Sequence, residues 1–97
     1  MNALYVYVLY SPTHDIFYKG QTSDLDERLK RHNQGLEKST KKYLPWLLIW
    51  KTRKDSRSEA MVLEKKLKNL SRQRLINFLK KNRKELVDES SYLKLIH

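Results

Sequence analysis

Residues 5–22 read YVYVLYSPTHDIFYKGQT, and this stretch decides the fold. Residues 5–10 and 16–22 are rich in β-branched and aromatic side chains, which favour β-strands. The five residues between them, SPTHD, are typical of a turn. Two strand-forming segments joined by so short a turn are predicted to pair as an antiparallel hairpin.

A helix and a third strand are expected after the hairpin. Ser23 is a good N-cap residue, and three acidic side chains follow it in the first turn, where the helix dipole favours them. The helix should end at Gly35, because glycine readily adopts the conformation that stops a helix. The apolar and aromatic run over 43–52 predicts a strand, with Pro45 near its start or at a sheet edge.

Two further helices are expected in the C-terminal part of the chain. Ser56 and Glu59 form a capping-box pattern, followed by apolar residues at spacings of three and four up to Leu70. Ser71 can cap the next helix. Residues 85–97 carry a weaker pattern, and four of their apolar side chains are expected to tie this tail to the body: Tyr92, Leu93, Leu95 and Ile96.

The order of these elements, ββαβαα, predicts an α+β fold. We expect a small three-stranded antiparallel or mixed sheet flanked by helices. The chain has 97 residues, a length that suits one domain over 1–97, with its core in 4–82 and a tail in 85–97.

The composition excludes several classes of protein. The absence of cysteine rules out disulfides, thiolate zinc sites and cysteine nucleophiles. No apolar run approaches the length of a membrane span, and the N-terminus lacks the basic region of a signal peptide, so a cytoplasmic location is expected.

The charge is strongly positive, with 21 Lys and Arg against 11 Asp and Glu, for a formal net charge of +10. Residues 1–22 are neutral as a group, so the whole excess lies further along the chain. Such an excess favours a polyanionic partner, above all nucleic acid. The alternative is a solvated lysine-rich surface that keeps a small protein soluble, or a protein-interaction domain with a basic surface.

Several side chains could act on a phosphodiester. Strand alternation places Tyr7 on one face of the first strand and Tyr18 with Gly20 on one face of the second. In a register that puts these faces together, the two tyrosines share a face, and Gly20 leaves room for a group to approach the backbone. Arg28 and His32 lie four residues apart on one side of the first helix. Packing alone could also explain the two tyrosines, the arginine and the histidine, because such side chains commonly fill strands and helix borders.

Glu64 borders the apolar stripe of the second helix, among several lysines. It could be an ion-pair partner, or a ligand for Mg²⁺, which is often held by one or two carboxylates while a substrate phosphate completes its shell. An arginine and a metal would stabilise charge on the phosphorane, with a tyrosine or a water on the ion supplying the attacking oxygen.

The order of these motifs resembles the GIY-YIG nuclease domain. The matching stretches are YVYVL at 5–9, YKGQT at 18–22, DLDERLKRHNQG at 24–35 and SEAMVLEKKLK at 58–68. The resemblance covers roughly residues 4–82 and is greatest for the short stand-alone bacterial members. The family also includes the incision domain of the bacterial excision-repair nuclease and phage homing endonucleases.

The resemblance implies roles for individual residues. Tyr7 and Tyr18 match the tyrosines of the two name-giving motifs, and either could be the general base. Arg28 matches the arginine that stabilises the transition state, and His32 a histidine of the homing and stand-alone branches. Glu64 matches the glutamate that binds the metal, expected to be Mg²⁺ or Mn²⁺.

The resemblance also marks departures and DNA contacts. Gln21 stands where the repair nucleases carry a lysine, and a late asparagine of several members has three possible matches, Asn69, Asn77 and Asn82. Seven side chains are expected to contact nucleic acid: Lys19, Gln21, Lys30, Arg31, Lys65, Lys68 and Arg72.

The resulting hypothesis is a metal-dependent DNA endonuclease that selects DNA structure rather than sequence. Because other members gain affinity from an appended DNA-binding domain, binding by this chain is expected to be weak and salt-sensitive unless a partner protein supplies the targeting. The alternative is a non-catalytic or weakly active nucleic-acid-binding module, in which only the basic helices act.

Overall fold

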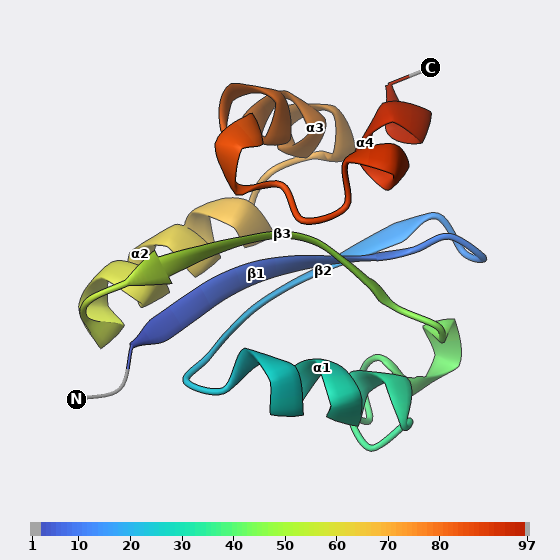
Figure 1. Cartoon of the computed structure of the whole chain (residues 1–97), viewed down its shortest axis with the longest axis horizontal. Coiled ribbons are helices and arrows are strands. Elements are labelled where there is room, and N and C mark those ends of the chain that lie inside the picture. The colour runs from blue at the N-terminus through green and yellow to red at the C-terminus, as the bar shows by residue number, and fades with distance from the viewer. Residues whose placement is uncertain (1–2, 97) are drawn as a thin grey trace.

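A computed structural model describes residues 3–96 and shows one antiparallel sheet of three strands (Figure 1). The strands are β1 (Leu4–Ser11), β2 (Ile16–Thr22) and β3 (Leu47–Lys54), in the order β2-β1-β3. The first two form the predicted hairpin, and β3 pairs antiparallel with the other edge of β1. The α+β prediction is therefore confirmed, and the sheet is antiparallel rather than mixed.

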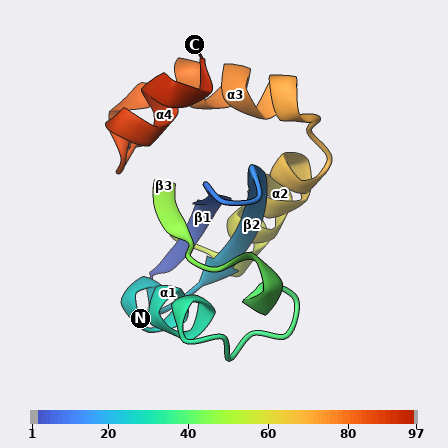
Figure 2. The ribbon, with the colours of Figure 1, turned by 90° about the vertical axis from the view of Figure 1, so that its right-hand side faces the viewer.

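Helices cover both faces of the sheet. Helix α1 (Leu25–Asn33) lies on one face, while α3 (Arg72–Lys81) and α4 (Glu89–Leu95) lie on the other (Figure 2). Helix α2 (Arg57–Lys68) runs beside β2 and packs against β2 and β1. Short 3-10 turns at Lys41–Tyr43 and Arg83–Glu85 complete the elements.

Because β1 is central and both of its faces are covered, nearly every β1 side chain is buried. Val6 and Val8 pack with the C-terminal helices, in a core that includes Leu67 and Leu75. Tyr7 and Leu9 point to the other face, toward Leu25 of α1 and Trp46. Each face of the sheet thus has its own core, and the tyrosine face is the smaller one.

The helix ends follow short-range chemistry, with one correction. Ser56 and Ser71 cap α2 and α3 as predicted, each accepting the backbone N–H of the residue three positions on. Helix α1, however, is capped by Asp24, whose carboxylate accepts the Glu27 N–H at 3.1 Å. The prediction of Ser23 as the cap was wrong by one residue, because the Thr22 hydroxyl accepts the Asp24 N–H and holds that residue at the helix start.

The third strand begins later than the apolar run suggested. Tyr43 lies in the 3-10 turn, and a cis peptide bond precedes Pro45. The backbone N–H and C=O of Trp46 bind the side chain of Asn33, at 2.7 and 3.0 Å, instead of a neighbouring strand. Those bonds keep residues 43–46 out of the sheet.

The C-terminal tail contains a helix that the weak sequence pattern did not reveal. Leu86 forms an isolated bridge with Trp50, Tyr92 is 1% exposed, and Leu95 packs on the same core. Leu93 and Ile96 are exposed, so only part of the predicted apolar contact is made. Among residues 3–96, no helix has both the length and the apolar character that a bilayer crossing demands.

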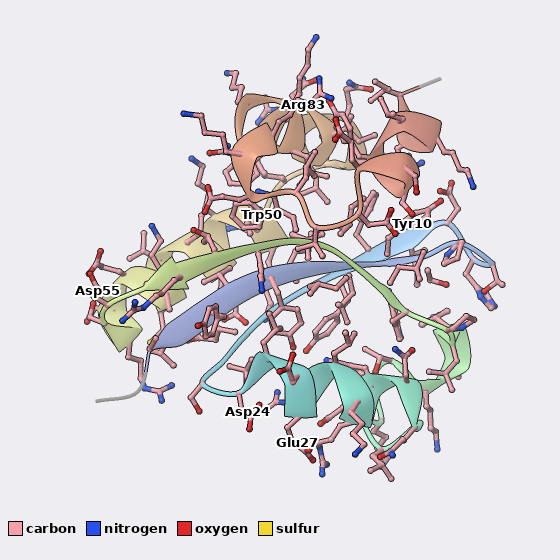
Figure 3. The ribbon with its side chains drawn as sticks, viewed as in Figure 1. Tyr10, Asp24, Glu27, Trp50, Asp55 and Arg83 are labelled. Atoms are coloured by element: carbon pink, nitrogen blue, oxygen red, sulfur yellow. The ribbon has the colours of Figure 1, made fainter. Side chains whose placement is uncertain are left out.

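Trp50 ties the tail and α3 to the sheet (Figure 3). It is 1% exposed, its indole N–H donates to the Asn82 carbonyl at 3.1 Å, and its ring meets Phe78 edge-on. Trp50→Phe should lower the free energy of unfolding by about 1–3 kcal/mol, through one lost hydrogen bond and an underfilled core. Urea unfolding measures this change, and an unaltered midpoint would contradict it.

Candidate active site

Tyr7, Tyr18 and His32 form an aromatic cluster between the sheet and α1. Strand β1 places Tyr7 there, β2 places Tyr18, and the last turn of α1 places His32. The Tyr7 hydroxyl lies 3.1 Å from Nε2 of His32, and the Tyr18 ring centroid lies 4.9 Å from the imidazole centroid. Tyr7 and His32 are almost completely buried, whereas Tyr18 is half-buried and forms the outer wall.

The hydrogen bonds around His32 define its tautomer. Nδ1 lies 2.8 Å from the Thr40 hydroxyl, which itself donates to the Glu37 carbonyl. A hydroxyl has one proton to donate, and Thr40 directs it to the Glu37 carbonyl at 3.4 Å, so the Nδ1–H tautomer is assigned to His32 from these hydrogen bonds. Nε2 then carries no proton and accepts the hydrogen bond from the Tyr7 hydroxyl.

The environment favours the neutral forms of both groups. Burial raises the pKa of Tyr7 strongly, and Tyr18 adds to this, while the nearby Arg28 acts in the opposite direction. Burial also lowers the pKa of His32, opposed by Glu37 and assisted by Arg28 and Arg31. At neutral pH, Tyr7 is therefore a phenol, bonded to an imidazole that can accept its proton.

Gly20 is opposite Tyr7 on β2 and makes room for its hydroxyl. A Cβ atom at position 20 would lie 2.7 Å from the Tyr7 hydroxyl oxygen and 3.0 Å from the Tyr18 ring. The room expected next to the Gly20 backbone is thus occupied by the Tyr7 side chain, and glycine is required because the tyrosine approaches the backbone so closely.

We expect Gly20→Ala to lower the free energy of unfolding by about 1–3 kcal/mol, because the buried Tyr7 ring cannot move aside without strain. In a double-mutant cycle with Tyr7→Phe, the cost should shrink only in part, since the hydroxyl oxygen is gone but the ring carbon Cζ, 2.8 Å from the new methyl, remains. Thermal unfolding of the four proteins measures both effects. Strictly additive costs would show that the hydroxyl is not the source of the clash.

Basic side chains on α1 meet Glu37 beside this cluster. Arg31 Nε lies 2.8 Å from a Glu37 carboxylate oxygen, and Arg28 Nε lies 3.9 Å from the same oxygen. Arg31 is thereby neutralised locally. Arg28 is the looser partner, half-buried, and its charge reaches Tyr7.

Glu64 lies across β2 from the aromatic cluster. Its helix, α2, starts at the Ser56 capping box, and eight residues later the Glu64 side chain, 19% exposed, faces β2. One carboxylate oxygen accepts from the Gln21 amide at 3.1 Å, and the other lies 3.4 Å from the Lys68 ammonium. Gln21 therefore contacts the glutamate directly.

The aromatic cluster and Glu64 lie on opposite sides of β2, but each is next to one of two consecutive residues of that edge strand. Gly20 touches the Tyr7 hydroxyl, and its neighbour Gln21 binds Glu64. Their Cα atoms are about 3.8 Å apart, as across any trans peptide. The sequence-predicted residues Tyr7, Tyr18, Arg28, His32 and Glu64 are thus brought to the two sides of β2.

A surface hollow of about 750 Å³ opens beside Glu64. Basic side chains from α2, Lys65, Lys68 and Arg57, line it. The exposed Met61 adds an apolar wall, and Asn69 also lines the hollow. Of the three asparagines that could match the family's late asparagine, only Asn69 lines this hollow.

The other residues predicted to contact nucleic acid lie in different surroundings, and one of them is far from the site. Lys19 is half-buried on β2, and burial lowers the pKa of its ammonium group. Lys30 is exposed on α1. Arg72 lies away from the site: it binds the Asp15 carboxylate at 2.9 Å and covers the Phe17 ring, joining α3 to the hairpin turn.

The residues at Glu64 suit a magnesium-like ion. Gln21 must turn its amide NH₂ toward the carboxylate, which leaves its oxygen buried and without a hydrogen-bond partner among the described residues. No cluster of three or more acidic or histidine ligands occurs in residues 3–96. One carboxylate and one free amide oxygen match Mg²⁺, which keeps several waters and binds substrate phosphates.

Three residues of the site were missed by sequence reasoning. Thr40 orients His32, Glu37 holds the α1 arginines, and Asn33 clamps the backbone of Trp46. Each acts across a loop, and a single sequence gives no period or spacing that marks such contacts. The one local pattern in this region is Asn33-Gln34-Gly35, which predicts the end of the helix but none of these three contacts.

A comparison with known protein families identifies the domain. The family model described as the GIY-YIG catalytic domain matches residues 3–77. The chain belongs to the GIY-YIG family. The GIY-YIG match spans the sheet, α1, α2 and most of α3, and ends before α4.

Curated relatives of this GIY-YIG chain are small proteins of similar length. A UPF0213 protein of Pediococcus pentosaceus is 39% identical over 83 residues, covering 84% of this chain and 86% of the relative. One from Bacillus licheniformis is 36% identical over 88 residues, covering 90% of both. The solution structure of a UPF0213 protein from Bacillus halodurans is 33% identical, with a TM-score of 0.55 over 80% of this chain and 83% of that one.

Proposed function

We propose that this GIY-YIG protein is a metal-dependent endonuclease that hydrolyses DNA phosphodiester bonds. The observation that carries the proposal is the buried Tyr7–His32 hydrogen bond, placed across β2 from Glu64. A proton acceptor, a cation and a metal-binding carboxylate around one edge strand are the groups that phosphodiester hydrolysis needs.

The proposed reaction uses Tyr7 as the general base, working through His32. Because Tyr7 is buried, the half-buried Tyr18 ring that forms the outer wall must turn aside before a water can reach the Tyr7 oxygen. As that water attacks phosphorus, its proton passes to the Tyr7 oxygen, and the Tyr7 proton passes to Nε2 of His32. The bond from phosphorus to the leaving oxygen then breaks, and that oxygen keeps the electron pair and takes up a proton from solvent water. Arg28 stabilises the charge that develops on the phosphoryl oxygens. Neutral His32 suits this role because its unprotonated nitrogen already faces the phenol.

Glu64 would hold the metal ion, with the Gln21 oxygen beside it. When bound, the ion supplies Lewis-acid stabilisation of the phosphoryl oxygens. Gln21 orients the carboxylate through its hydrogen bond, and the Lys68 ammonium lies beside the other oxygen, where an ion would have to displace it.

Selection of DNA structure rather than sequence is part of the proposal. The basic side chains around Glu64 suit backbone phosphates, which carry no base identity. Binding should accordingly weaken steeply as salt rises.

The alternative is a nucleic-acid-binding module without catalysis. It is favoured by the two contacts that already occupy Glu64, from Gln21 and Lys68. Incubation with supercoiled, branched and single-stranded DNA, in Mg²⁺, Mn²⁺ or EDTA, separates the two functions. Metal-dependent nicking that Glu64→Ala abolishes supports the nuclease, and binding without nicking at every metal concentration favours the module.

Cleavage is expected to fall on the acid side of neutrality. Protonation of His32 would occupy Nε2 and remove the acceptor for the Tyr7 proton. Because burial depresses the pKa of His32 below about 6.5, the acid limb should lie below that pH and fall about tenfold per pH unit. The groups that face His32 and set this limb are Tyr7, Tyr18, Arg28, Arg31 and Glu37.

Single-turnover rates between pH 5 and 8 measure this limb. The His32→Gln variant should be slow at every pH and lack the limb. A wild-type limb centred above the ordinary histidine range, or one that survives in His32→Gln, would contradict the assignment.

A further inference from the structure

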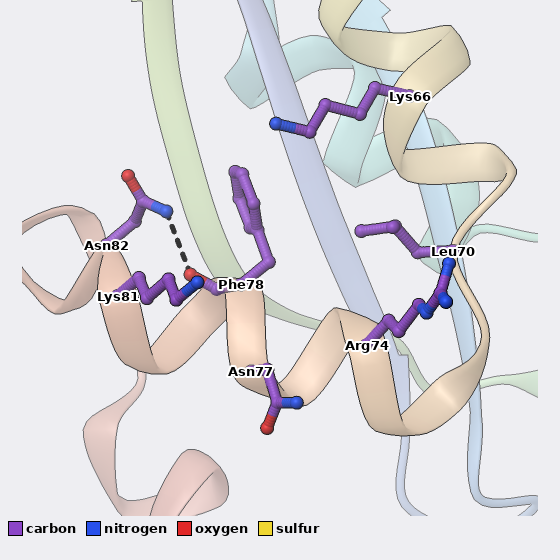
Figure 4. A pocket seen from close by; sticks show the side chains of 7 residues that line it. All are labelled: Lys66, Leu70, Arg74, Asn77, Phe78, Lys81 and Asn82. Carbon is purple, nitrogen blue, oxygen red and sulfur yellow. Dashed lines mark hydrogen bonds between the residues drawn. The ribbon is translucent and has the colours of Figure 1, made fainter.

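A second groove lies on the opposite side of α2 from Glu64. It has a volume of about 430 Å³ and runs between the C-terminal half of α2 and the exposed side of α3 (Figure 4). Lys66 and Leu70 line it, whereas Glu64 and Lys68 line the hollow at the candidate site. At 100° per residue, Lys66 lies 200° from both Glu64 and Lys68 and so on the opposite side of α2, and Leu70 follows the end of the helix.

The groove gathers positive charge without any acid. Lys66, Arg74 and Lys81 are exposed in it, and none of its lining residues is acidic. Within residues 3–96, no carboxylate forms an ion pair with these three cations, whereas Arg31, Lys68 and Arg72 each have one. Three like charges around one concavity repel one another, so an anion bound there would relieve the repulsion.

The chemistry between the cations suits a nucleotide strand. Phe78 lies between them with its ring 5.7 Å from the Lys66 ammonium, and the two point toward each other in Figure 4. Asn77 accepts from Gln73, which leaves its NH₂ group to donate. Phosphate-binding cations interleaved with an aromatic ring and an amide are typical of grooves that follow single nucleic-acid strands.

The spacing indicates a polymer rather than a small anion. Arg74 and Lys81 are two helical turns apart, about 10 Å along α3, which is too far to hold one phosphate together. Lys65 lines the hollow at Glu64, and its neighbour Lys66 lines this groove, so a basic path crosses α2 between them. Helix α2 is about 10–12 Å wide, a distance that a few nucleotides span.

We propose that the α2–α3 groove binds a second stretch of the phosphodiester backbone, from the strand whose other part lies at Glu64. The proposal rests on the proposed nuclease function, since it assigns the same DNA to both places. The groove would supply affinity away from the reacting phosphate, through Lys66, Arg74 and Lys81.

Charge reversal in the groove tests this proposal without chemistry. The triple variant Lys66→Glu, Arg74→Glu, Lys81→Glu is compared with a matched triple at exposed lysines elsewhere, Lys38→Glu, Lys42→Glu, Lys94→Glu. The probe is a fluorescent 20-nucleotide single strand in EDTA, measured by anisotropy over a range of salt. Both triples change the net charge equally, so their difference reports the groove alone.

The groove triple should bind about tenfold more weakly than the matched triple. Its plot of log affinity against log salt should also be flatter by about 2, since three phosphate contacts on a single strand are lost. Equal affinities and slopes for the two triples would overturn the proposal. Displacement by polyglutamate as effective as by unlabelled DNA would also overturn it, by assigning the groove to acidic proteins.

Two controls keep the outcome readable. Circular dichroism verifies that each triple folds, and if the groove triple unfolds, glutamine replaces glutamate at the same positions in both triples. Metal-dependent cleavage by the wild type is measured separately. If the wild type cleaves DNA but the two triple variants bind it equally well, the groove proposal is wrong and the nuclease proposal stands. If the groove triple binds DNA more weakly but the wild type shows no cleavage, the nuclease proposal is wrong and the groove is a binding site.

Discussion

Replacing Tyr7 with phenylalanine is expected to lower the single-turnover rate of DNA cleavage by about 10²–10⁴-fold, the range that general-base catalysis contributes. The phenylalanine ring fills the same buried space on β1, so packing against Leu25 and Trp46 is kept. Only the hydroxyl is removed, and with it the group that passes a proton to Nε2 of His32. The metal and Arg28 remain, which is why some cleavage should persist.

Tyr18→Phe is the matched control, because Tyr18 belongs to the same aromatic cluster. Its hydroxyl forms no hydrogen bond with another residue among 3–96, so its loss should cost much less than that of Tyr7. Single-turnover cleavage with enzyme in excess isolates the chemical step for both variants. A Tyr18→Phe variant slower than Tyr7→Phe would exchange the roles of the two tyrosines.

The fold was largely predictable because its signals are local. Alternation in residues 5–22 determines which side chains share a face within each strand, and the observed register then brings Tyr7 and Tyr18 to the same face of the hairpin. The capping box at Ser56 likewise acts over one helical turn. Such contacts depend on neighbours within a few residues, which a single sequence displays.

The parts that escaped prediction depend on distant contacts. The start of β3 is displaced because Asn33, thirteen residues earlier than Trp46, takes the backbone bonds that would extend the strand. Thr40 could not be recognised as the partner of His32 for the same reason. The side chain of Arg72 binds Asp15, 57 residues away in sequence. Nothing in local periodicity marks these pairs.

The structure also divides the cations into those that pair with a carboxylate and those that do not, a difference that the composition does not reveal. Arg31 and Arg72 are neutralised by Glu37 and Asp15. Lys66, Arg74 and Lys81 have no such partners in the described part of the chain. The net charge of +10 therefore overstates the role of some cations and understates that of others.

Glu64→Gln is expected to lower cleavage by about 10³-fold or more, because a metal ion stabilises the transition state by several kcal/mol and its one carboxylate is lost. Glutamine has the same length, and its amide oxygen can still accept from Gln21, so the local packing should survive. Mn²⁺ binding without DNA should weaken in parallel, as measured by electron paramagnetic resonance. Glu59→Gln on the same helix is the matched control, since the Glu59 carboxylate accepts from the Ser56 cap and does not line the hollow at Glu64.

A change at Lys68 gives a second test of metal binding at Glu64, because the Lys68 ammonium lies 3.4 Å from the Glu64 oxygen that a metal would approach. Removing it with Lys68→Met should tighten Mn²⁺ binding in the absence of DNA, since the ion no longer competes with a fixed positive charge. If Mn²⁺ binding fails in both Glu64→Gln and Lys68→Met, Lys68 assists the ion instead of opposing it. If neither change alters Mn²⁺ binding, Glu64 is an ion-pair residue, and its assignment as the metal-binding carboxylate is wrong.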